Sequence, residues 1–71
     1  MKTFRVFLQP EPEGGFTVTV PSLPGCVTYG KTVAEAQRMA REAVEVCLEF
    51  LQERGEAIRD DSQTLEWILT V

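Results

Sequence analysis

A cluster of prolines and glycines in the middle of the chain restricts how any strand before it can continue. The segment PSLPG, residues 21–25, follows the alternating sequence FTVTV. Pro21 and Pro24 lack the backbone donor that a sheet ladder needs, and Gly25 accepts left-handed backbone angles that other residues avoid. We therefore expect a sharp corner here, followed by a third short strand, CVTYG, that ends at Gly30.

Two segments before this corner have the period of β-strands. In TFRVFLQ and in FTVTV, apolar residues recur at every second position, as they do in strands with one buried face. The sequence between them, QPEPEGG, breaks both a ladder and a helix. It predicts a hairpin with a long acidic tip, on which Glu11 and Glu13 are exposed.

A helix start follows the third strand. Thr32 and Glu35 form the pattern T-V-A-E, in which the hydroxyl and the carboxylate each bind an amide left unpaired at a helix start. The following pattern predicts a helix over about residues 33–54, ended by Gly55.

The apolar stripe of this helix is wider than one sheet face requires. Residues at its edges, Met39, Val46 and Phe50, are candidates for contact with a second subunit. The alternative is that the stripe sinks deeper into its own sheet.

The last segment, TLEWILTV, alternates again and predicts a fourth strand. A right-handed helical crossover would place it parallel to the first strand and beside it. The expected fold is α+β with the order β-β-β-α-β: a four-stranded mixed sheet with one long helix on one face, in a single domain over residues 1–71.

The sheet face opposite the helix is expected to carry Arg5, Phe7, Glu66 and Ile68, with Val27 or Tyr29 possible additions. One helix cannot cover both faces of a sheet, so another copy or a partner protein would cover this patch. Scattered exposed apolar residues are also common on monomers, and this alternative stays open.

Size and charge narrow the class of function. A chain of 71 residues buries only about 60% of its unfolded surface, which favours support from a homodimer or tetramer. The net charge of -4 disfavours direct nucleic-acid binding and suits a basic partner. We see no signal peptide and no membrane-spanning run, so we expect a cytoplasmic protein without membrane contact.

No constellation for catalysis or metal binding is visible. The chain has no histidine, and Cys26 and Cys47 are far apart in the sequence, without a base or a ligand cluster. A disulfide between them is disfavoured in a reducing compartment. No carboxylates converge as a metal-dependent nuclease requires. We therefore expect a non-enzyme without cofactor or metal.

The sequence GGFTVTVPSLPGCVTYGKTVAEA, residues 14–36, resembles the signature of HicB-like antitoxins: an alternating strand, P-x-L-P-G-C, a short strand, a glycine and a T-x-x-E-A helix start. The similarity extends over nearly the whole chain. It implies a partial ribonuclease H-like fold without catalytic carboxylates, in which Pro21, Pro24, Gly25 and Gly30 are structural turn residues.

The resemblance also implies a partner: a small basic HicA-type toxin that cleaves mRNA and whose RNA-binding surface the antitoxin covers. Many HicB proteins carry a C-terminal DNA-binding domain, whereas this chain stops at Val71, so we expect no separate DNA-binding domain. The alternative function is that of an orphan homo-oligomeric protein-binding module without a toxin.

Overall fold

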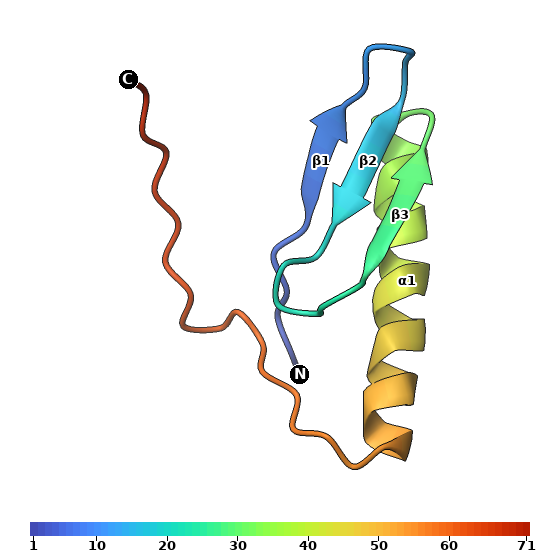
Figure 1. The fold of residues 1–71 in the computed structure, drawn as a ribbon, viewed down its shortest axis with the longest axis vertical. Helices are drawn as coiled ribbons and strands as arrows, with labels where there is room; N and C mark the ends of the chain where they lie inside the picture. The colour runs from blue at the N-terminus through green and yellow to red at the C-terminus, as the bar shows by residue number, and fades with distance from the viewer.

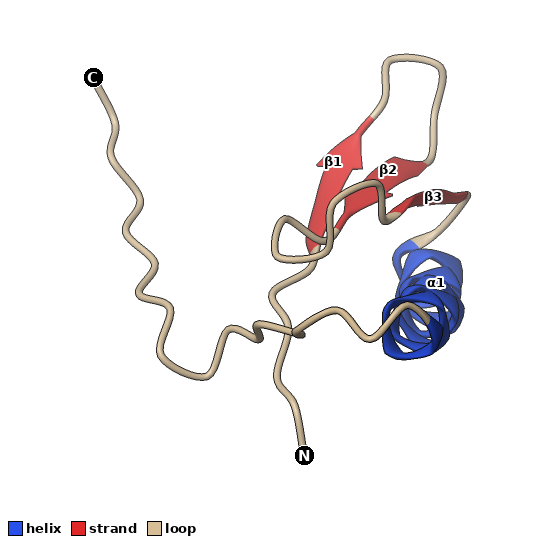
Figure 2. Ribbon diagram, turned by 60° about the horizontal axis from the view of Figure 1, so that its bottom comes forward, coloured by secondary structure: helices blue, strands red, loops and turns tan.

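A computed structural model describes residues 1–71, which form three antiparallel strands followed by one long helix (Figure 1). The strands are β1 (Phe7–Pro10), β2 (Phe16–Thr19) and β3 (Val27–Gly30), and the helix is α1 (Val33–Glu53). The sheet order is β1-β2-β3, and α1 packs against β2 and β3. Figure 2 shows the helix on one side of the sheet. The expected α+β class and the order of these four elements are confirmed.

The hairpin between β1 and β2 forms as the sequence predicts. Phe7 pairs with Thr19 at the open end of the ladder. At the closed end, the amide of Glu11 donates to the carbonyl of Gly15 at 3.0 Å. Gly14 and Gly15 have φ angles of 104° and 77°, which other residues rarely adopt. Glycine therefore makes this tight reversal possible.

The corner between β2 and β3 is also confirmed. The amide of Leu23 donates to the carbonyl of Val20 at 2.9 Å, and the amide of Cys26 donates to that of Leu23 at 3.0 Å. Gly25 has φ 79°, as expected from its place after Pro24. Because Leu23 is only 2% exposed, the corner contributes to the core as well as reversing the chain.

Both ends of α1 are capped. The hydroxyl of Thr32 accepts from the amide of Glu35 at 3.1 Å, and the Glu35 carboxylate accepts from the amide of Lys31 at 3.0 Å. At the other end Gly55 has φ 69°, and the amide of Glu56 reaches back to the carbonyl of Leu51 at 3.0 Å. This is the Schellman pattern, in which a glycine after the last turn lets the chain satisfy free carbonyls.

Only a small core holds the sheet and the helix together. Eight of the 71 residues are buried. One cluster joins Val18 of β2 to Ala36 and Ala40 of α1, and in a second cluster Val20, Leu23 and Cys26 are buried together. Because the helix contributes alanines, it lies close to the sheet. Because few apolar side chains are shielded from water, burying further apolar surface would increase the stability of this chain.

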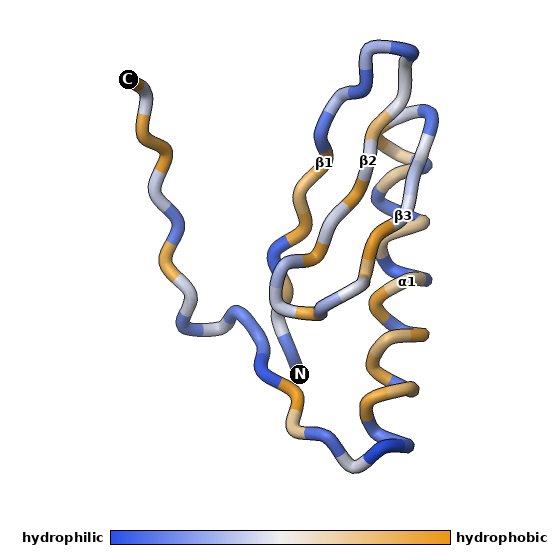
Figure 3. Tube along the Cα trace, in the orientation of Figure 1, coloured by the Kyte–Doolittle hydropathy of each residue, from blue (hydrophilic) through white to orange (hydrophobic).

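The structure has three strands and not four, so the expected fourth strand is absent, and neither the four-stranded mixed sheet nor the ribonuclease H-like arrangement is confirmed. Residues 56–71 form neither helix nor strand, and the C-terminal end of this segment lies apart from the sheet (Figures 1 and 2). From Leu65 to Val71 every second residue is still apolar, and Figure 3 shows hydrophobic stretches in this terminal part. Alternation shows that a segment can pair with one face buried, but it does not provide an edge for the segment to pair with. Here Leu65 and Trp67 stay 94% and 81% exposed.

The beginning of this C-terminal segment is nevertheless tied to the body. Asp61, 6% exposed, accepts hydrogen bonds from the amide of Arg5 at 2.8 Å, the hydroxyl of Ser22 at 2.6 Å and that of Thr64 at 2.7 Å. Its own amide donates to the carbonyl of Thr3 at 2.6 Å. The sequence indicated only a polar linker here, because nothing local shows that a carboxylate 56 residues after Arg5 will meet it.

The first prediction concerns the close approach of β3 to α1. A Cβ built on Gly30 would lie 2.4 Å from the backbone nitrogen of Ala36. Gly30→Ala should therefore lower the free energy of unfolding by about 1–3 kcal/mol, the usual cost of overpacking. Chemical denaturation measures this change.

The comparison is with Gly25→Ala, where no atom lies within 4 Å of the added Cβ and only the positive φ opposes the change. If Gly30→Ala unfolds at the wild-type denaturant concentration, the close approach does not constrain the fold.

The second prediction concerns acid stability. Hydrogen bonds from the Arg5 amide, then from Ser22 and Thr64, hold the pKa of Asp61 below its ordinary value. A lowered folded-state pKa stabilises the fold above the unfolded pKa of about 3.9, and this stability is lost as pH falls through the lower folded value. Asp61→Asn should be less stable at neutral pH and should lose less stability on acidification.

Melting temperatures measured from pH 7 down to acid measure both effects. Glu13→Gln, which removes the same charge from an exposed position in the hairpin tip, is the control and should keep the wild-type acid profile. Identical acid profiles for Asp61→Asn and wild type would show that Asp61 is no anchor.

Candidate interaction surfaces

The open face of the sheet carries large apolar side chains. The register aligns Phe7 with Thr19 and Val27, and Thr17 with Tyr29. Alternation therefore puts these side chains on one face, opposite the one that packs on α1. Phe7, Val27 and Tyr29 are 44%, 59% and 46% exposed. The structure thus places Phe7 on the face where the sequence predicted it, and Val27 and Tyr29 both lie on the same face. We call the surface formed by Phe7, Thr17, Thr19, Val27 and Tyr29 the open face.

Of the other residues expected on this face, Arg5 and Glu66 contact each other, whereas Ile68 does not reach the sheet. Arg5 is half-buried, and its guanidinium lies 3.6 Å from the Glu66 carboxylate and 3.0 Å from the carbonyl of Thr64. Ile68 is 81% exposed on the C-terminal segment and lies off the sheet. Its expected place was wrong because the strand that would have carried it is not paired.

The hairpin tip differs from the prediction in one residue. Glu13 is exposed, as expected. Glu11 is half-buried, and its carboxylate accepts a hydrogen bond of 2.6 Å from the Thr17 hydroxyl. The reason is that Glu11 continues the alternation of β1, which puts its side chain on the same face of the sheet as that of Thr17. Tyr29 ties the same tip to β3 by donating to the carbonyl of Gly14 at 3.0 Å.

The predicted edge residues of the helix are partly uncovered. Val46 and Phe50 are 64% and 55% exposed, while Met39 is half-buried. The guanidinium of Arg54 lies 5.2 Å from the centre of the Phe50 ring, which shields one side of that ring. No second subunit is part of this structure, so contact through these three residues stays a prediction.

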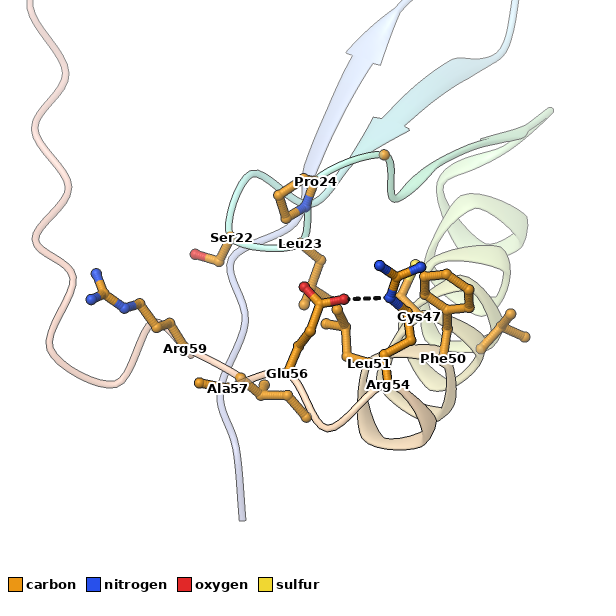
Figure 4. Close-up of a pocket in the computed structure, with 13 residues that line it drawn as sticks. Ser22, Leu23, Pro24, Cys47, Phe50, Leu51, Arg54, Glu56, Ala57 and Arg59 are labelled. Carbon is orange, nitrogen blue, oxygen red and sulfur yellow. Dashed lines mark hydrogen bonds and ion pairs between the residues drawn. The ribbon is translucent and has the colours of Figure 1, made fainter.

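Val46 and Phe50 border a groove of about 770 Å³ between the second half of α1, the corner and residues 56–59 (Figure 4). Leu23 and Leu51 line the groove, as do Arg54 and Glu56, which form an ion pair 2.6 Å long. The sequence did not suggest this groove, because the corner and the linker approach the helix only in the folded chain.

Neither cysteine is placed for nucleophilic chemistry. Cys26 is 3% exposed, Cys47 is half-buried, and both are free thiols. Burial, followed by the hydrogen bond and charge of Cys47, raises the pKa of Cys26 to about 11. At neutral pH its reactive thiolate form is therefore rare.

Two further observations concern ions and membranes. No group of three or more Cys, Asp or Glu side chains is arranged to hold a metal ion. The helix α1 is too polar over its length to cross a lipid bilayer.

The chain is similar to curated proteins from bacteria and archaea. It is 36% identical over 63 residues to a UPF0150 protein of Thermoplasma acidophilum, covering 87% of this chain and 91% of that protein. A UPF0150 protein of Archaeoglobus fulgidus is 39% identical over 57 residues, covering 78% of this chain and 83% of that protein.

Antitoxin HicB of Escherichia coli K12 is 40% identical over 55 residues. The match covers 78% of this chain and 40% of the Escherichia coli protein, so it concerns less than half of that longer chain.

The sequence profile of the HicB_like antitoxins of bacterial toxin-antitoxin systems matches residues 4–70, which include all three strands, the helix and nearly all of the C-terminal segment. Together with the three relatives, this match identifies the chain as a member of the HicB-like antitoxin family.

Proposed function

We propose that this protein is an antitoxin that binds a small basic HicA-type toxin and prevents it from cleaving mRNA by covering its RNA-binding surface. In this function the protein performs no chemistry, and inhibition is steric. Family membership supports the antitoxin class. The net charge of -4 supports a basic partner, because complementary charge speeds the encounter of two proteins.

The open face carries the proposal. Interfaces tend to have an apolar, often aromatic centre within a polar rim, and Phe7, Val27 and Tyr29 provide such a centre around two threonines. Thr17 also binds Glu11, so a carboxylate borders this centre. Tyr29 anchors the hairpin tip, which places the loop of Glu13 at the same end of the face.

In this arrangement the charged rim and the apolar centre of the open face affect different steps of binding. Exposed carboxylates at the rim act over a distance and raise the association rate, while desolvated aromatic and apolar side chains at the centre slow dissociation. A toxin whose basic surface is held against the open face has no room for RNA there.

The alternative, an orphan homo-oligomeric module without a toxin, is favoured by a different observation. The C-terminal segment exposes several large apolar residues, among them Trp67 and Leu69, that a second copy could cover. Self-association and toxin binding are compatible if they use different surfaces.

Native co-purification from the source cells tests the proposal directly. The tagged full chain should recover a small basic protein in fixed stoichiometry, and adding the purified chain should stop RNA cleavage by that protein. Recovery of this chain alone, from cells that express the neighbouring small genes, contradicts the toxin partner.

The third prediction places a charge on the open face, at Val27 in the edge strand β3. Val27→Glu should abolish inhibition of the recovered toxin, because an unpaired carboxylate would be buried in the interface. Titrating RNA cleavage against antitoxin concentration measures the loss.

Val33→Glu is the matched control: Val33 is similarly exposed, at 49% against 59% for Val27, but begins the helix on the other side of the sheet. Both variants should be checked for wild-type circular dichroism. Full inhibition by Val27→Glu would move the toxin site off the open face.

The fourth prediction concerns steering. Glu13→Lys should lower the association rate constant with the toxin and flatten its dependence on salt, with little change in the dissociation rate. Stopped-flow or surface-based kinetics at several salt concentrations measures both rates. Glu49→Lys, which makes the same charge change on the exposed side of α1, should have a smaller effect. Equal effects of the two variants would indicate that net charge alone matters.

A further inference from the structure

The last seven residues form an extended segment without a partner; we call residues 65–71 the C-terminal arm. Its apolar side chains are almost fully in water, with exposed fractions of 94% for Leu65, 81% for Trp67, 81% for Ile68 and 64% for Leu69. After Thr64 the arm makes one ion pair, through Glu66, and no hydrogen bond to the sheet. A contiguous apolar segment of this kind marks an interaction site.

The sheet has a free edge that can receive such a segment. The strand order leaves the outer side of β1 unpaired. Val20 donates across to Cys26 on the β3 side, so by alternation Thr19 faces β1, where its partner is Phe7. The N–H and C=O groups of Leu8 therefore point to the open edge. A strand that adds here gains backbone hydrogen bonds with β1.

An apolar groove lies beneath that edge. Because α1 packs on β2 and β3, one side of the helix near β1 stays uncovered. The groove there has a volume of about 620 Å³, and its apolar wall includes Phe4 and Val6 from the first segment and Val44 and Leu48 from the helix. Side chains on the inner face of a strand added to β1 would enter this groove.

The arm has the length and the pattern that this edge requires. Seven extended residues span about 23 Å, more than the four residues of β1 occupy. By alternation Leu65, Trp67 and Leu69 share one face, which would lie in the groove, while Glu66, Ile68 and Thr70 would stay outside. The apolar face of the arm matches the apolar part of the groove wall. A copy of this chain therefore suits the groove better than a basic toxin does.

The position of the arm indicates which copy receives it. The amides of Thr3 and Arg5 donate to the carboxylates of Asp60 and Asp61, which holds the residues before the arm at the start of the first strand segment. From that point the arm leaves its own sheet, as both ribbon views show (Figures 1 and 2). Each chain therefore presents an arm that its own body holds only through the ion pair of Glu66 with Arg5, and an edge that its own arm does not fill.

We infer that two copies of this chain exchange C-terminal arms, each arm adding as a strand along the outer edge of β1 in the other copy. Reciprocal exchange of identical elements closes a two-fold dimer without leaving a free arm. It buries the apolar residues on the inner face of both arms and enlarges a core that has only six buried apolar residues in each chain. The open face of each sheet stays free, so the dimer does not depend on the proposed toxin function.

The fifth prediction is that the full chain sediments at about twice its mass of 8.0 kDa. A chain ending at Thr64 should sediment as a monomer, as should Leu69→Asp, which puts a charge on the inner face of the arm. Thr70→Asp adds the same charge on the outer face and should keep the dimer. A monomeric full chain, or equal behaviour of the two aspartate variants, overturns the inference.

A second measurement separates exchange from a dimer in which each arm pairs with its own β1. Chains labelled with ¹⁴N and ¹⁵N are unfolded and refolded together, with a photoreactive phenylalanine derivative in place of Trp67. After illumination, peptides that join the arm to the segment containing β1 should include mixed-isotope pairs. Same-isotope pairs alone would show that each arm stays with its own chain, and would overturn exchange.

The test of arm exchange gives a result whether or not the chain binds a toxin. Loss of the dimer in Leu69→Asp together with retained inhibition of RNA cleavage would support both proposals. A dimer that neither binds nor inhibits a toxin would leave the exchange standing and contradict only the antitoxin mechanism.

Discussion

The close approach of α1 to the sheet is the contact on which the rest of this structure depends. Gly30 leaves no room for a side chain against the backbone of Ala36, and the buried alanines Ala36 and Ala40 bring the helix against Val18. A helix held this close excludes water with very few buried atoms. The capped start at Thr32 lies two residues after the end of β3. The helix therefore begins at a fixed point close to the sheet.

This placement of the helix also determines what stays uncovered. Because α1 covers β2 and β3, the β1 side keeps a free strand edge and an apolar groove. The opposite face of the sheet presents Phe7, Val27 and Tyr29 to solvent. A single helix on a small sheet thus produces two separate surfaces, one suited to a partner protein and one suited to a strand.

Sequence reasoning was accurate where a feature depends on neighbouring residues. The hairpin, the corner at Gly25 and the helix start all formed as expected, since turn chemistry and capping act over a few residues. It was wrong for the fourth strand and for the exposure of Glu11. Alternation around Trp67 indicates a segment that can pair in a sheet, but pairing also needs an available edge at the right place. The groove beside Phe50 had no local signal at all.

The sequence by itself determined the order of the three strands and the helix, the turns and the family, because these follow from period, backbone preference and motif. Only the tertiary structure decided that Asp61 anchors the linker to Arg5 and Ser22, and that the C-terminal arm stands free of its own sheet. The physical reason is range: a hydrogen bond between residues far apart in the chain depends on where the whole fold places them.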